Sequence, residues 1–178
     1  MTLRLPAIVV TIFTGVAVLQ AAPAPDVSVR EDHGTYVVTA QFEVAAAPAT
    51  ALQVLSDYER IPEFAPGVKR SVVKERQGSR VVVEQEAVSR VLMFSKRVHL
   101  VLDIEQDDSS IAFRDICGRS FIAYSGSWRV GPSTEGASIV YLLSAKPAFD
   151  VPQFILVRLL KKDAVEMINN LRREIERR

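Results

Sequence analysis

The sequence has few of the residues from which catalytic and metal sites are usually recognised. It contains one cysteine, Cys117, so no internal disulfide can form. Its two histidines, His33 and His99, lie far apart and lack the H-x-x-x-H or C-x-x-C spacing of a metal site. No glycine-rich phosphate loop is present, and "YSGSW" lacks the G-x-S-x-G order of a nucleophile elbow. We therefore expect no metal, no cofactor and no catalytic residue that a motif would identify.

The charged residues are balanced, which removes another class of partner. The chain of 178 residues carries 22 Lys and Arg and 21 Asp and Glu, a formal net charge of +1. A basic excess is the electrostatic signature of nucleic-acid binding, so we expect no nucleic-acid partner. The length fits one domain, and no repeat or low-complexity segment divides it.

The first 24 residues differ from the rest of the chain. A basic residue, Arg4, precedes a mostly apolar run from Leu5 to Leu19, and small residues and prolines follow. This is the outline of a secretory signal peptide, and the run is short for a transmembrane helix, which needs about 20 residues. We expect residues 1–24 to be a signal peptide and the protein to be exported to the periplasm. An uncleaved membrane anchor is the alternative.

The remaining sequence alternates in a way that is typical of strands. Residues 25–34 are expected to be a linker into the fold. Apolar and polar residues then alternate, as in strands with one buried face, over 35–44, 68–76, 80–88, 94–106, 111–116, 121–130 and 138–146. Helical spacing is found over residues 45–58 and again from Pro152 to Glu176. The short connections favour an antiparallel sheet, so the predicted fold class is α+β, with helices on one face of the sheet.

Four stretches of the sequence resemble a known family. They are "DYERIPEFAPGVKRSVV", "EQEAV…FSKRVHLVLDIE", "IAFRDICGRSFIAYSGSWRV" and "PAFDVPQFILVRLLKKDAVEMI". Together they resemble the polyketide cyclase/dehydrase and lipid-transport superfamily (SRPBCC, START-like), nearest to its coenzyme Q-binding START-like bacterial branch. The resemblance implies the helix-grip fold over residues 35–178, in which a curved antiparallel sheet wraps around a long C-terminal helix. It also implies an internal cavity that binds lipids, quinones, sterols or polyketides.

A cavity would account for several residue choices in the strands. Four residues of one strand share its parity and are expected to face the same side: Ile122, Tyr124, Gly126 and Trp128. If that side is the cavity, Gly126 leaves room for a ligand, while Tyr124 and Trp128 supply apolar bodies with polar tips. Gln85 shares parity with apolar residues of its own strand and would bring a polar group into the pocket. A packed core with satisfied hydrogen bonds is the alternative.

The junction after the first helix contains an unusual aromatic residue. Pro62 and Pro66 stop the helix and stiffen the connection, and Phe64 lies between them. The family fold puts this connection at the open end of the C-terminal helix. We expect Phe64 to be the lid of the cavity, or else a residue that caps the core.

The start of the C-terminal helix is apolar on more than one side. Phe154 and Leu160 are therefore expected to form one wall of the cavity. Three basic residues lie beside them on the same helix: Arg158, Lys161 and Lys162. They indicate either a solvated face or a transient contact with lipid head groups at a membrane.

Three functions are compatible with these features. The first is a non-catalytic carrier or sensor that binds a hydrophobic small molecule, such as a lipid, a quinone or a polyketide-like compound, in the cavity. The second is a cyclase or dehydratase that acts on a polyketide-like substrate in the same cavity. The third is an interaction module that uses the sheet and has no ligand. The inward faces offer Gln85 and Tyr124 but no carboxylate or histidine, which favours the carrier.

Overall fold

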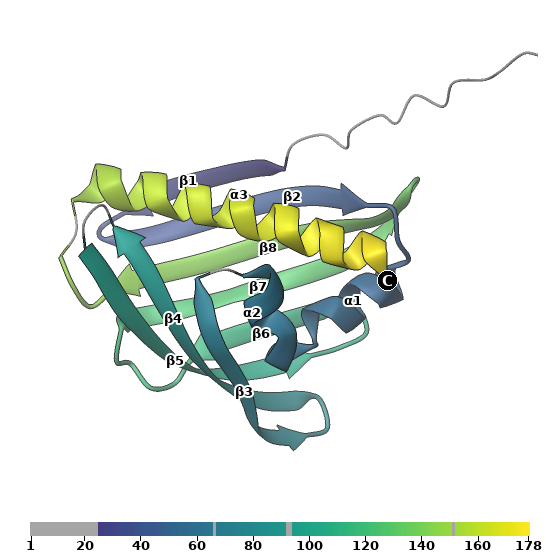
Figure 1. The fold of residues 1–178 in the computed structure, drawn as a ribbon, viewed down its shortest axis with the longest axis horizontal. Helices are drawn as coiled ribbons and strands as arrows, with labels where there is room; N and C mark the ends of the chain where they lie inside the picture. Colours follow the sequence, from purple (N-terminus) through teal and green to yellow (C-terminus); the bar gives the residue numbers. More distant parts are fainter. Residues whose placement is uncertain (1–24, 66, 92–93, 151) are drawn as a thin grey trace, which may run out of the picture.

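The computed structural model describes residues 25–65, 67–91, 94–150 and 152–178 (Figure 1). Within these ranges the chain forms one eight-stranded sheet, two short helices joined by a 3₁₀ turn, and one long helix. The strands are β1 (Asp26–Asp32), β2 (Thr35–Val44), β3 (Val68–Gln77), β4 (Arg80–Val91), β5 (Phe94–Gln106), β6 (Ser110–Asp115), β7 (Phe121–Ser133) and β8 (Gly136–Pro147). The helical segments are α1 (Pro48–Leu55), η1 (Tyr58–Arg60), α2 (Ile61–Phe64) and α3 (Gln153–Arg177).

Every pair of neighbouring strands is antiparallel, in the order β1-β2-β8-β7-β6-β5-β4-β3. The strands from β3 to β8 follow one another as hairpins. β2, in contrast, pairs with the last strand, so that Tyr36 lies opposite Ala145. The sheet curves around the helices, and α3 lies across its concave side (Figure 1). The predicted α+β class and the helix-grip arrangement are confirmed.

Residues 25–34 are not a linker, as the sequence pattern suggested, but include the edge strand β1. All seven residues of β1 pair with β2, and Val27 is buried. The turn between the two strands is His33-Gly34, with φ angles of 48° and 78°. Two successive residues with positive φ match the twist of a two-residue hairpin, in which glycine is strongly preferred. The segment is therefore structured because its hairpin and its contacts with α3 hold it against the sheet.

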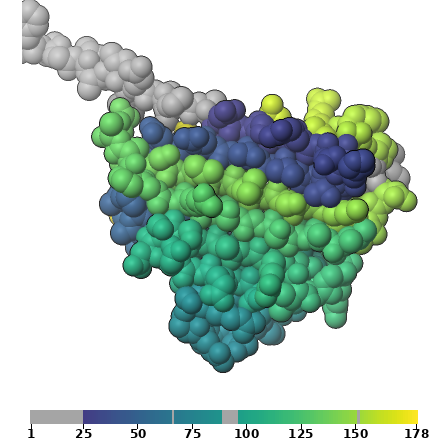
Figure 2. All heavy atoms as spheres, turned by 180° about the vertical axis from the view of Figure 1, so that it is seen from behind, coloured from purple at the N-terminus to yellow at the C-terminus, as the bar shows by residue number. Residues whose placement is uncertain are grey.

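One face of the sheet and one face of α3 form the core. The predicted apolar face of β5 is buried, as Val98, Leu100, Leu102 and Ile104. The buried apolar residues of α3 recur at helical steps: Leu156, Ala164, Ile168, Leu171 and Ile175. The opposite face of the sheet is seen in Figure 2, where the bands of β1, β2, β8 and β7 lie side by side. No helix in the described ranges has the length and apolar content that a membrane span requires.

The start of β7 departs from the predicted alternation. A register irregularity between Phe121 and Ala123 shifts the side-chain pattern by one residue. As a result Phe121 packs against the core, whereas Ile122 is 68% exposed. The expectation that Ile122 faces the same side as Tyr124 is wrong, because an extra residue in one strand reverses the parity on its far side.

Candidate ligand cavity

A cavity lies between the concave face of the sheet and the segments η1, α2 and α3. Its volume is about 130 Å³. Six of its lining residues are aromatic: Tyr58, Phe64, Phe113, Tyr124, Trp128 and Tyr141. The other lining residues are aliphatic, except for Gln85 and Met167. An apolar cavity of about 150 Å³ accepts a molecule of the size of benzene, so this one has room for about one aromatic ring.

Two polar side chains of the lining are held by the protein itself. Gln85 is buried on β4, and its Nε2 donates to Oγ of Ser71, 3.2 Å away on the neighbouring strand β3. The hydroxyl of Tyr58 donates to Oε1 of Gln106 at 2.6 Å. Burial raises the pKa of Tyr58 to about 12, although the nearby Arg76 lowers it. Tyr58 is therefore a neutral hydrogen-bond donor whose acceptor is already in place.

Tyr124 and Tyr141 contribute two more hydroxyls to the cavity, from the adjacent strands β7 and β8. Neither hydroxyl has a hydrogen-bond partner among the described residues. Burial raises the pKa of Tyr124 to about 12 and raises the pKa of Tyr141 well above its ordinary value of 10.0. Both phenols therefore remain protonated at neutral pH and can act as donors.

Phe64 forms part of the wall between the cavity and the surface. Its side chain is only 6% exposed and belongs to the hydrophobic core. It lines the cavity and also a second hollow, of about 480 Å³, which lies outside between α2 and the end of α3. Phe64 is thus packed as a core residue while it separates the cavity from solvent.

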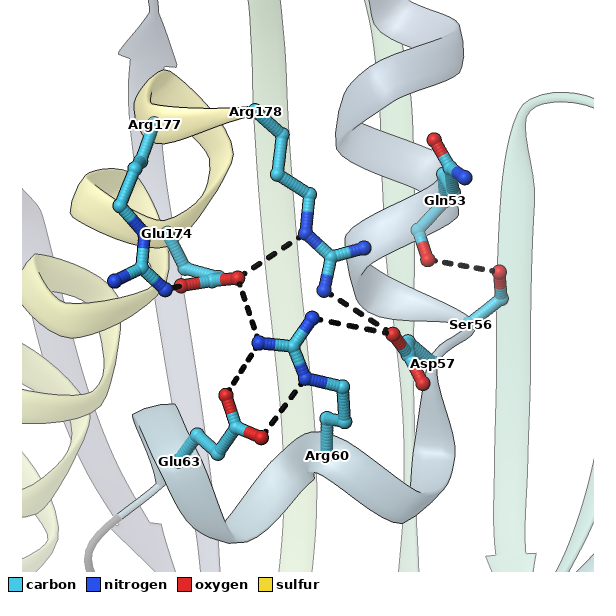
Figure 3. A network of polar contacts seen from close by, with 8 residues as sticks. All are labelled: Gln53, Ser56, Asp57, Arg60, Glu63, Glu174, Arg177 and Arg178. Atoms are coloured by element: carbon cyan, nitrogen blue, oxygen red, sulfur yellow. Dashed lines mark hydrogen bonds and ion pairs between the residues drawn. The ribbon is translucent and has the colours of Figure 1, made fainter.

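Ion pairs fasten this wall to the end of α3 (Figure 3). Arg60, which precedes α2, lies 3.4 Å from the carboxylate of Glu174 on α3. The same carboxylate pairs with Arg177 and Arg178, and Arg178 also reaches Asp57 at 3.1 Å. The Glu174 side chain is 9% exposed. One nearly buried carboxylate therefore holds three guanidinium groups from two segments that are far apart in sequence.

A larger groove runs between α3 and the strands β3 to β5, beside the cavity. This α3 groove has a volume of about 520 Å³. It shares four wall residues with the cavity: Ala65, Val68, Tyr124 and Met167. Its charged residues are Lys69, Lys162, Asp163 and Glu166. The shared side chains therefore lie between the groove and the cavity and separate the two spaces.

Four of the predicted ligand residues line the cavity: Phe64, Gln85, Tyr124 and Trp128. They come from α2, β4 and β7, which the fold brings together around one space. Alternation along the strands therefore placed Gln85 and Trp128 on the correct, concave face of the sheet. A contact between these residues and a ligand stays a prediction.

Gly126 does not leave room for a ligand in the way the strand pattern suggested. A Cβ atom at this position would lie 2.4 Å from the backbone oxygen of Leu142 and 2.5 Å from Cζ of Phe113. The space above the glycine is therefore occupied by the Phe113 ring, which itself lines the cavity. Gly126 allows this ring to pack closely against β7.

Phe154 and Leu160 do not line the cavity either, contrary to expectation. Phe154 is 76% exposed, and Leu160 is half-buried where it packs against the core. The cavity lies under a later part of α3, which contributes Met167 to its wall. In the first turns of α3, Leu156 is buried. The other apolar residues of these turns are more exposed than Leu156.

Sequence reasoning missed several lining residues, above all Tyr58, Phe113 and Tyr141. A signal was available for Tyr141, because it alternates with Ile139 and Leu143 on a strand with a buried face. Phe113 offered a weaker signal, since its strand has six residues and only Ile111 shares its side as a large apolar residue.

Cys117 lies outside the cavity lining, in the connection from β6 to β7. Its thiol is half-buried and lies 3.7 Å from the carbonyl oxygen of His99. Across the described ranges, no three His, Cys, Asp or Glu side chains are grouped so that they could hold a metal ion.

A curved antiparallel sheet that grips a long C-terminal helix around an apolar cavity defines the helix-grip class of START-like proteins. The chain belongs to the family described as polyketide cyclase / dehydrase and lipid transport, which it matches over residues 35–176. A search of curated proteins finds no match to it.

Solved structures show the same fold at low sequence identity. The Zhui aromatase/cyclase from Streptomyces sp. R1128 is 17% identical, with a TM-score of 0.68, over 81% of this chain and 95% of its own. A START superfamily protein from Mycobacterium smegmatis is also 17% identical, with a TM-score of 0.65, over 79% and 97%. A STAR-related lipid transfer protein from Xanthomonas axonopodis is 14% identical, with a TM-score of 0.61, over 86% and 99%.

Proposed function

We propose that this protein binds a hydrophobic small molecule in its internal cavity and carries or senses it without converting it. The observation that carries the proposal is the cavity itself, whose wall is aromatic and aliphatic with a few neutral polar groups. Such a lining desolvates an apolar ligand, and its few polar groups can fix the ligand's orientation. A lipid, a quinone or a polyketide-like compound fits this description. Membership of a family that includes lipid transport supports it.

Binding is tested by what the protein retains when it is purified from its own host. Organic extracts of the protein and of a variant with a filled cavity, Ala65→Phe, are compared by mass spectrometry. Ala65 is buried in the cavity wall, so a larger side chain there takes up ligand space. We expect a hydrophobic compound in the wild-type extract that is depleted in the variant. Identical extracts from both folded proteins would contradict the proposal and favour an interaction module without a ligand.

The alternative function is a cyclase or dehydratase acting in the same cavity, and the similarity in fold to an aromatase/cyclase supports it. The two functions differ in the fate of the bound compound. A carrier returns the compound unchanged after incubation, whereas an enzyme returns a product with altered mass or ring number. Incubating the protein with the compound recovered from it, followed by mass spectrometry, distinguishes them.

We also propose that the protein is exported and that residues 1–24, which lie outside the described residues, act as a signal peptide. The short apolar run with small residues after it supports this. Cell fractionation and N-terminal sequencing are the test, with a mature start between about residues 22 and 25 as the expected result. Recovery of protein that begins at Met1 in the cytoplasm would contradict export.

A transient contact with a membrane is proposed for the first half of α3. The exposed Phe154 and the basic residues Arg158, Lys161 and Lys162 support it, because an apolar side chain and cationic neighbours favour an anionic lipid surface. Sedimentation with vesicles that contain anionic lipid is the measurement. We expect Phe154→Ala and Lys161→Glu each to reduce the bound fraction. Equal sedimentation of the variants and the wild type would exclude this surface.

A further inference from the structure

The cavity contains two hydroxyls for which the protein provides no acceptor. Tyr124 and Tyr141 line it from β7 and β8, and neither hydroxyl is hydrogen-bonded to a described residue. Tyr58 lines the same cavity but donates to Gln106 at 2.6 Å. Neither hydroxyl is among the fully buried side-chain atoms of the described residues that lack a partner, so both open onto the space of the cavity. A phenol is a hydrogen-bond donor, so both hydroxyls are available to an acceptor oxygen of whatever occupies the cavity.

The rings that carry these hydroxyls are held in place. The ring of Tyr141 stacks on Trp128 with 4.1 Å between centroids, and the two residues are direct partners in the sheet. The ring of Tyr124 packs against Phe121 at 4.8 Å and against Phe113 at 6.0 Å. Because neighbouring rings fix each phenol, the hydroxyls are preorganised and do not have to be ordered when a ligand binds.

The acceptor that this cavity favours is neutral. No Lys, Arg or His is found among the described residues that line the cavity, so nothing in the wall would neutralise a buried carboxylate or phosphate. An unpaired charge in an apolar cavity is far more costly than a neutral oxygen. A carbonyl or ether oxygen accepts a hydrogen bond from a phenol without that cost.

We propose that Tyr124 and Tyr141 form a donor pair that selects a neutral oxygen acceptor on an aromatic ring bound in the cavity. The inference rests on the proposed binding function and narrows its ligand to a ring compound with a carbonyl or ether oxygen. The cavity of about 130 Å³ holds the ring.

The test compares two compounds of similar shape, acetophenone with a carbonyl and isopropylbenzene without one. Trp128 is the single tryptophan of the chain and lines the cavity. Its indole N–H therefore gives one resolved NMR signal whose shift reports binding at this site. The same spectrum shows whether each variant is folded. Titrations are run on the wild type, Tyr124→Phe, Tyr141→Phe and the control Tyr36→Phe, which changes a buried tyrosine outside the cavity lining.

We expect Tyr124→Phe and Tyr141→Phe each to weaken acetophenone binding by roughly threefold to tenfold, the value of one neutral hydrogen bond. Isopropylbenzene binding should change by less than about twofold, because it has no acceptor to lose. Tyr36→Phe should leave the binding of both compounds unchanged, because Tyr36 is not among the residues that line the cavity. Benzoate, an anion of similar size, should bind more weakly than acetophenone.

The outcomes separate the inference from the proposed function. In one outcome, both compounds shift the Trp128 signal while neither tyrosine variant changes the ratio of their affinities. That result overturns the donor pair, and binding in the cavity stands. Benzoate binding as tight as that of acetophenone also overturns it. If neither compound shifts the signal at its solubility limit, the cavity does not accept ring compounds. The inference is then overturned, and the proposed function is decided separately by the comparison of organic extracts from the wild type and Ala65→Phe.

Discussion

Gly126 lies at the closest approach between β7 and the Phe113 ring, and its lack of a side chain has a measurable consequence. The Cβ of an alanine would meet a backbone oxygen at 2.4 Å, and backbone cannot move aside as a flexible side chain can. We expect Gly126→Ala to lower the free energy of unfolding by about 1–3 kcal/mol. Gly131→Ala, on the same strand but with no atom within 4 Å of its Cβ, should change it by less than about 0.5 kcal/mol. Urea denaturation measures both, and equal effects would contradict the close packing.

Asp103 links the stability of the protein to pH. Hydrogen bonds from Arg114 and Arg80, both at 2.7 Å, hold the pKa of its carboxyl below the ordinary value of 3.8. A carboxyl whose pKa is lower in the folded state stabilises that state above the ordinary pKa. This contribution is lost as the pH falls through the lower, folded value.

We therefore expect Asp103→Asn to be less stable than the wild type at about pH 7, and the gap to narrow towards about pH 3. Asp108→Asn removes the same charge at an exposed turn position and is the control. Chemical denaturation at each pH gives the difference in unfolding free energy between each variant and the wild type. A gap that stays constant from neutral to acidic pH would show that the ion pairs do not depend on the carboxylate charge.

For Asp103, the sequence predicts which face of the strand the side chain lies on, but not which residues it contacts. Alternation along residues 94–106 puts Asp103 on the polar face of β5, opposite Leu102 and Ile104. It did not reveal that Arg80 and Arg114, from the two flanking strands, cover the carboxylate and leave it 8% exposed. Pairing between strands is set by register, and one strand's own pattern does not contain the register of its neighbours.

At the scale of elements, α2 depends on the end of α3 for its position. Glu174 on α3 is the carboxylate that Arg60, Arg177 and Arg178 share. Replacing it by glutamine leaves three cations without their common anion. We expect Glu174→Gln to lower the melting temperature by about 2–6 °C. Glu86→Gln, which breaks one exposed pair with Arg70, should shift it by less than about 1 °C. Scanning calorimetry measures both melting temperatures. Equal shifts in the two variants would show that Glu174 contributes no more than an exposed ion pair.

Phe64 links this wall to ligand exchange. Because it is buried in the core, we expect Phe64→Ala to cost about 3 kcal/mol of unfolding free energy. Because it also separates the cavity from the outer hollow, the same change should speed the release of a fluorescent quinone analogue. Phe154→Ala, at an exposed position, should change neither quantity. A loss of stability with unchanged release would make Phe64 a core residue without a gating function.

Most elements could be predicted from the sequence, and the exceptions have identifiable causes. Seven strands were predictable from apolar alternation bounded by turn residues, and α3 from its long helical spacing. β1 was missed although His33-Gly34 is a hairpin turn, since the strand is an edge with only Val27 fully buried. The part of α3 that forms the cavity wall was predicted wrongly: Met167 lies there, and Phe154 and Leu160 do not. Apolar character alone does not show which helix residues lie over the cavity.

At the scale of the whole molecule, the sheet and α3 should unfold together. Buried residues of α3 such as Ile168 and Leu171 belong to the same core cluster as the strands, so neither part keeps its apolar face covered without the other. We expect loss of helical circular dichroism and change of Trp128 fluorescence to share one midpoint in urea. Ile168→Ala should move both midpoints equally. Loss of the helix signal ahead of the fluorescence change would show that α3 detaches independently.

The pairing of β2 with β8 also has a consequence for synthesis. As the chain emerges from the ribosome, β3 to β7 can pair with neighbours that have just been made, but Tyr36 must wait for Ala145. Such long-range pairing is slow to form, and until it forms the middle of the sheet has two unpaired edges. The protein is therefore completed late, by its last strand and the helix that follows. For most of its translation the chain therefore cannot close the sheet, because the partner of β2 has not yet been made.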